Sequence, residues 1–140
     1  MPFGTDRSKS KGVVVLAVDD EPIVLKVVSS ILARSGYRVL TAASAEEALG
    51  IFEREPWVDL LLADVILPGR SGPELAETLL SRQPALRVLF TAGMPDSPMI
   101  RAGVLDKGYE LIPKPFQAAE LAARVRRVLE APRARSANST

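Results

Sequence analysis

VVVLAVDDE, residues 13–21, is an unbroken apolar run that ends in three adjacent acidic residues. A short Val-rich run without polar alternation is typical of a strand that is buried on both faces of a parallel sheet. In sheets of that kind, the reactive crevice lies at the carboxyl ends of the strands. The sequence therefore predicts that Asp19, Asp20 and Glu21 lie at such an edge.

Three later segments repeat this arrangement of a short run followed by a chemically useful side chain. Asp64 follows VDLLLA, Thr91 follows RVLF, and Lys114-Pro115 follows ELIP. Pro68-Gly69 closes the loop beyond Asp64. If these segments are neighbouring strands, their terminal side chains converge on one site.

Between these runs the pattern alternates with helices. Strands are expected at 13–18, 37–42, 58–63, 87–90 and 110–112, and helices at 22–35, 44–56, 71–82, 97–106 and 117–130. Ser44 with Glu47, and Ser71 with Glu74, have the spacing of a capping box, and Gly36 suits a left-handed helix C-terminus. Gly103 weakens the fourth helix by about 1 kcal/mol relative to Ala. Five strand–helix units predict an α/β fold with a doubly wound parallel sheet and helices on both faces.

Length and composition are those of one ordinary globular domain, with 140 residues and a net charge of +1. The absence of His and Cys excludes disulfides, thiol chemistry and a phosphohistidine on this chain. We expect the domain to span 13–131, with disordered tails at 1–12 and 132–140 and no room for a DNA-binding module. No secretory signal or membrane span is apparent, and we expect a cytoplasmic protein.

The segments VDDEP, DLLLADVILPG, SGPEL and IPKPF together resemble the receiver domain of bacterial two-component response regulators, over nearly all of residues 13–130. The stretches GYRVLTAASAEEAL and VLFTAG particularly resemble receivers attached to hybrid sensor histidine kinases. The resemblance implies a flavodoxin-like fold with strand order 2-1-3-4-5. It also implies that Asp64 accepts a phosphoryl group.

Three clustered carboxylates favour a hard cation, since two like charges about 4 Å apart repel by about 4 kcal/mol at an effective dielectric of about 20. Oxygen ligands without His or Cys indicate Mg²⁺ or Mn²⁺. By resemblance, Asp20, Asp64 and the Ile66 backbone carbonyl bind the metal directly, and Asp19 acts through water. Lys114 would bind the phosphoryl group, and the Lys114-Pro115 bond is predicted to be cis as in the family.

Two positions depart from the family pattern. Counting along the chain places the family's switch Ser/Thr on Ala92, whereas a shifted strand exit would restore Thr91, and both alternatives stay open. The aromatic residue usually found three positions before the lysine is Leu111 here. We therefore expect Tyr109 and Phe116, the nearest aromatic residues, to be packing residues.

The expected partners are a sensor histidine kinase or histidine phosphotransfer domain, docking near helix 22–35, and a downstream protein target. No nucleic acid or membrane partner is expected, and the chain is expected to be a monomer or weak dimer. The main alternative is a pseudo-receiver scaffold that is never phosphorylated. A haloacid-dehalogenase-type enzyme would need an acid where Ile66 stands, and a nucleotide-binding module would need a glycine-rich phosphate loop that is absent.

Overall fold

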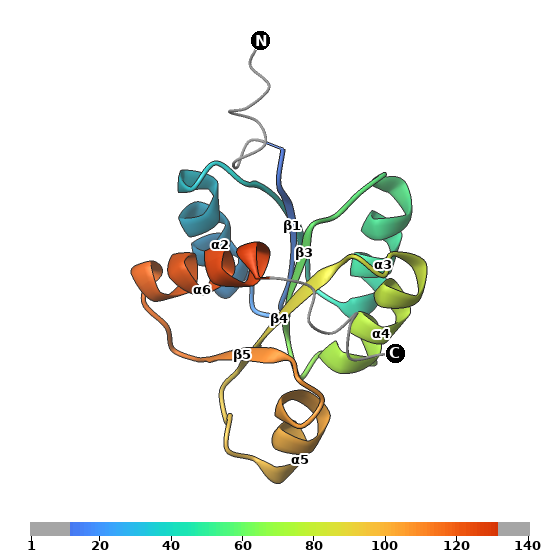
Figure 1. The fold of residues 1–140 in the computed structure, drawn as a ribbon, viewed down its shortest axis with the longest axis vertical. Helices are drawn as coiled ribbons and strands as arrows, with labels where there is room; N and C mark the ends of the chain where they lie inside the picture. Colours follow the sequence, from blue (N-terminus) through green and yellow to red (C-terminus); the bar gives the residue numbers. More distant parts are fainter. Residues whose placement is uncertain (1–11, 132–140) are drawn as a thin grey trace.

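The computed structural model describes residues 12–131, so the predicted tails lie outside the described residues apart from Gly12. Strands and helices alternate along the chain (Figure 1). The strands are β1 (Val14–Val18), β2 (Arg38–Ala42), β3 (Leu60–Asp64), β4 (Arg87–Ala92) and β5 (Glu110–Pro113). The helices are α2 (Pro22–Arg34), α3 (Ala45–Arg54), α4 (Gly72–Arg82), α5 (Pro98–Ile100) with a π-helix at Arg101–Leu105, and α6 (Ala118–Glu130).

The sheet is five-stranded and parallel with the order β2-β1-β3-β4-β5, as the resemblance implied. Helices α2 and α6 cover one face, and α3, α4 and α5 lie on the other side (Figure 1). The central strands β1, β3 and β4 are almost wholly buried, which accounts for their unbroken apolar sequences. Along each of these strands, successive side chains point to opposite faces of the sheet and pack in two separate cores. Each face of the sheet therefore has its own apolar layer.

Local sequence signals set several helix ends as predicted. The Ser71–Glu74 pair forms a full capping box at the start of α4, and Gly36 adopts a φ of 90° beyond α2. The pair at α3 forms only half a box. Ser44 accepts from the Glu47 amide, but the Glu47 carboxylate accepts from the Ala43 amide instead of the Ser44 amide.

Two predicted strand boundaries were wrong by two residues, for reasons of tertiary structure. β3 begins at Leu60 because the Gln83 side chain pairs with the backbone of Val58, through bonds of 3.3 Å to its N–H and 2.6 Å to its carbonyl. β4 extends beyond Phe90 to Ala92 because both neighbours pair with its end. The Val65 amide donates to the Thr91 carbonyl and the Lys114 amide donates to the Ala92 carbonyl.

The predicted helix at 97–106 is the least regular element of the fold. It consists of one α-helical turn, α5, followed by the π-helix in which the Asp106 amide donates to the Arg101 carbonyl at 2.9 Å. Gly103 lies inside this π-helical stretch. Because glycine has a low propensity for the α-helix, it favours regular α-helical hydrogen bonding less than other residues would. A helix is therefore present where the sequence predicted one, but only its first turn is α-helical.

Candidate functional site: a carboxylate–lysine pocket at the carboxyl edge of the sheet

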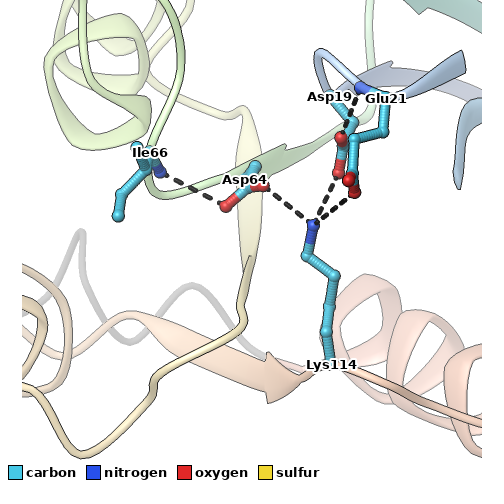
Figure 2. A network of polar contacts seen from close by, with 5 residues as sticks. All are labelled: Asp19, Glu21, Asp64, Ile66 and Lys114. Carbon is cyan, nitrogen blue, oxygen red and sulfur yellow. Dashed lines mark hydrogen bonds and ion pairs between the residues drawn. The ribbon is translucent and has the colours of Figure 1, made fainter.

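Lys114 joins residues from three strand ends in one network of polar contacts (Figure 2). Its ammonium lies 2.9 Å from an Asp64 carboxylate oxygen and 3.0 Å from an Asp19 oxygen. Glu21 adds a longer ion pair at 3.8 Å. Asp64 and Asp19 are 50 and 95 positions from Lys114 in sequence, and the parallel sheet brings the three residues together. The predicted convergence of Asp19, Asp64 and Lys114 is thus observed.

The acidic side chains have the composition of a hard-cation site. Asp19, Asp20 and Asp64 each present a carboxylate oxygen within 4.8 Å of the others. Asp19 is committed to protein partners, since one oxygen accepts from the Glu21 amide and the other from Lys114. Asp20 is exposed, and within residues 12–131 its carboxylate makes no hydrogen bond or ion pair. An all-oxygen set with one uncommitted carboxylate fits Mg²⁺ or Mn²⁺.

Burial and charge oppose each other at the two central residues. Burial raises the pKa of Asp64, and the hydrogen bond and charge of Lys114 only partly counter it. For Lys114, burial works to lower the pKa, but hydrogen bonds and charges from Asp64 and Asp19 outweigh it and the pKa is raised. The ammonium form of Lys114 is therefore favoured. The single ammonium of Lys114 does not balance the carboxylates of Asp19, Asp20 and Asp64. The pocket therefore has excess negative charge, which a divalent cation would neutralise.

Thr91, rather than Ala92, shares the Asp64 face of the sheet. Asp64 pairs with Thr91 in register between β3 and β4. Thr91 lines a small cavity with Asp19 and Val24, whereas Ala92 packs in the core on the opposite face. Counting along the chain had favoured Ala92. Side chains at successive strand positions point to opposite faces, so Thr91 and Ala92 lie on different sides of the sheet, and the assignment of the switch hydroxyl to either position stays a prediction.

The loop after Asp64 turns sharply before α4 begins. Gly69 has a φ of 78°, and the Arg70 amide donates to the Pro68 carbonyl at 2.9 Å. This is consistent with the predicted structural role of the Pro68-Gly69 pair, since Gly alone adopts positive φ without steric cost. The Ile66 amide donates to an Asp64 oxygen at 3.2 Å, while the Ile66 side chain is exposed and points away from the network (Figure 2). The Lys114-Pro115 peptide bond is cis, as predicted.

The aromatic residues near the lysine pack in the two cores. Tyr109 is buried with its ring edge-on to Phe90, 5.1 Å between centroids, and Phe116 is partly buried against the other core. Leu111 is half-buried, and its carbonyl accepts a 2.6 Å bond from Arg124 of α6. These positions agree with the expectation that Tyr109 and Phe116 are packing residues.

One residue of the site was missed entirely from sequence. Gly72 opens α4 directly against the backbone of Asp64, at a distance that leaves no room for a side chain. The capping box around it was recognised, but nothing in a linear pattern shows which backbone a glycine approaches.

Sheet order, flanking helices and an acidic pocket with a lysine together define a flavodoxin-like α/β domain of the signalling type. The chain belongs to the response regulator receiver domain family, whose sequence model matches residues 15–126. It is therefore a receiver domain of two-component signalling. None of the helices within residues 12–131 has the length and apolar character needed to cross a bilayer.

Relatives include a transcriptional regulatory protein and a sensor kinase. The chain is 32% identical over 123 residues to the probable transcriptional regulatory protein TcrX of Mycobacterium tuberculosis, covering 88% of this chain and 52% of TcrX. It is 35% identical over 127 residues to the sensor kinase CckA of Brucella abortus, covering 90% of this chain and 13% of CckA. The chain thus spans about half of the first relative and a small part of the second.

Solved receiver structures share the whole fold. A receiver domain protein from Methanospirillum hungatei superimposes with a TM-score of 0.77 at 30% identity, over 84% of this chain and 94% of that one. The receiver domain of the hybrid histidine kinase CckA gives 0.70 at 36% identity, over 84% and 99%. The similarity to CckA, in sequence and in structure, fits a receiver of the kind attached to hybrid histidine kinases.

Proposed function

We propose that this chain is a phosphoacceptor in which Asp64 takes a phosphoryl group from a phosphohistidine of a separate donor protein. The observation that carries the proposal is the Lys114 ammonium held 2.9 Å from Asp64 and 3.0 Å from Asp19 at the carboxyl edge of the sheet. The deciding experiment is phosphorylation by acetyl phosphate with Mg²⁺, compared with Asp64→Asn.

The proposed transfer forms one bond and breaks one. An Asp64 carboxylate oxygen attacks phosphorus, the P–N bond to the donor imidazole breaks, and the imidazole leaves with the electron pair. Lys114 is placed to pair with the transferring oxygens, and a hydroxyl at Thr91 lies on the same face to bind the phosphoryl group. A divalent ion held by Asp20, Asp64 and the Ile66 carbonyl, with Asp19 acting through water, would supply further charge neutralisation. The chain then catalyses only its own phosphorylation and slow dephosphorylation.

Magnesium is expected to stabilise the folded protein through Asp20. At a free concentration 100 times the dissociation constant, binding to the native state alone adds about 2.7 kcal/mol to the free energy of unfolding. Asp20→Asn should abolish most of this gain without destabilising the metal-free protein, because the Asp20 side chain has no protein partner within residues 12–131. Thermal unfolding with and without Mg²⁺ measures both effects. An Asp20→Asn protein that is stabilised by Mg²⁺ as fully as the parent would contradict this metal site.

The donor is proposed to dock on α2, next to the acidic pocket. Ile23 is 75% exposed and Val27 lies one turn further along the same exposed stripe, so α2 presents apolar surface although its other side packs in the core. Exposed apolar side chains beside a phosphorylation site fit contact with the helices of a histidine-bearing domain. A monomeric or weakly dimeric state, a cytoplasmic location and a downstream protein target are proposals of the same kind.

Ile23→Glu is expected to slow phosphotransfer from the cognate histidine domain about 10-fold, the cost of losing one significant contact residue. The same variant should react with acetyl phosphate at the parental rate, because the small donor needs no docking surface. Met99→Glu serves as the matched control, since Met99 is also 75% exposed but lies on the other side of the sheet. Equal slowing in both variants would argue against docking on α2.

The alternative is a scaffold that keeps the pocket but is never phosphorylated. Absence of any phosphoryl adduct on the parent protein at saturating acetyl phosphate and Mg²⁺ would favour this alternative over the proposal.

A further inference from the structure

We infer that Gly72 is a positioning residue for the phosphoacceptor, because its missing side chain lets α4 pack directly on the peptide that follows Asp64. The inference rests on the proposed function and names a residue that controls the geometry of its site. Gly72 is buried and opens α4 at the end of the loop that leaves Asp64.

The contact leaves no space for even a methyl group. A Cβ at Gly72 would lie 2.4 Å from the Asp64 carbonyl oxygen and 3.1 Å from the Val65 Cα. Both obstacles are backbone atoms, so no side-chain rotation removes them. Gly72 does not have a positive φ, and its requirement is therefore for space rather than for conformational freedom.

Hydrogen bonds hold the backbone of Val65 from two sides. The Gly72 amide donates to the Val65 carbonyl at 2.8 Å, and the Val65 amide donates to the Thr91 carbonyl at 2.9 Å. The backbone just beyond Asp64 is thereby clamped between β4 and the start of α4. Restoring an ordinary contact distance would require a displacement of about 1 Å, which the Asp64 main chain or α4 must absorb.

Helix α4 has little freedom to retreat. Its first turn is held by the reciprocal Ser71–Glu74 capping box, and its inner face is anchored by buried side chains of Leu75, Ala76 and Leu79. The displacement is therefore expected to reach Asp64 and the adjacent Ile66 segment. A misplacement of about 1 Å at reacting groups can cost about 100-fold in rate.

The test compares Gly72→Ala with Leu79→Ala in the intact chain. Leu79 lies two turns further along the same helix and is fully buried, so its truncation destabilises α4 without touching the Asp64 peptide. For each folded variant, Mg²⁺ affinity is measured by calorimetry, and the phosphorylation rate by acetyl phosphate at saturating Mg²⁺. Gly72→Ala is expected to lower the affinity about 10-fold and the rate about 10- to 100-fold. Leu79→Ala should leave both quantities within about 2-fold of the parent.

Two results would overturn the inference. One is a folded Gly72→Ala protein whose affinity and rate both match the parent within about 2-fold. The other is a Gly72→Ala protein that stays unfolded even in trimethylamine N-oxide, an osmolyte that strengthens burial. That outcome would give Gly72 a folding role in place of a positioning role. Failure of the parent itself to bind Mg²⁺ or accept phosphate would instead refute the proposed function.

Discussion

Asp64→Asn is expected to abolish phosphorylation by acetyl phosphate, with a loss of at least about a thousandfold in rate. The amide cannot act as the nucleophile, because it lacks the anionic oxygen that attacks phosphorus. Its side chain remains close in size and able to accept from Lys114, so the fold should persist. Intact-mass measurement after incubation with acetyl phosphate and Mg²⁺ counts the phosphoryl groups. The parent is expected to gain one.

Asp96→Asn supplies the matched control for this experiment. Asp96 has a side chain that is 98% exposed in the segment after β4, and its contact with Arg101 is a long 3.9 Å pair. Removing that carboxylate should leave the rate unchanged. Hydroxylamine should release the phosphoryl group from the parent, as it does from acyl phosphates in general. Continued labelling of Asp64→Asn at the parental rate would place the nucleophile elsewhere and end the case for Asp64.

Lys114→Met is expected to lower the free energy of unfolding of the metal-free protein by about 3 kcal/mol, the lower end of the range for breaking a buried ion pair. Asp19 and Asp64 have side chains only 5% and 12% exposed, and the Lys114 ammonium pairs with both. Methionine keeps the length of the stem while removing the charge. Two buried carboxylates then face each other without a counter-charge, and Mg²⁺ should recover part of the loss by replacing it.

The comparison variant for this stability measurement is Lys107→Met. Lys107 pairs with Glu77 at 3.7 Å, but both side chains are more than half exposed, so the change should stay below about 0.5 kcal/mol. Urea denaturation in a chelating buffer measures both variants, and repetition in Mg²⁺ tests the recovery. Adding Asp64→Asn to Lys114→Met should also recover stability, because it removes one of the two repelling charges. Equal costs for Lys114→Met and Lys107→Met would mean that the pocket is too well hydrated for this interaction to matter.

Much of the fold was predictable because its signals are local. The Val-rich run before Asp19 and the apolar run before Asp64 each indicate a buried strand from a few consecutive residues. Ser71 with Glu74 marks a helix start in the same way. Such signals depend only on neighbours along the chain. They predicted the order of the elements, and the boundaries of the elements to within about two residues.

Other features had no local signal. Which of Thr91 and Ala92 shares the face of Asp64 depends on how β4 pairs with β3. The start of β3 depended on Gln83, which is 25 positions away from Val58. Each of these is a relation between segments, and one added residue in a strand turns a side chain to the opposite face.

By itself, the sequence determined the α/β class, the parallel sheet and the residues available for an acidic pocket, because hydrophobic period and helix caps act over a few residues. Tertiary structure alone decided which carboxylates share Lys114, which face carries Thr91, and how closely Gly72 approaches Asp64. Those are distances between atoms on different elements. They are set by strand register and helix packing, which no single segment encodes.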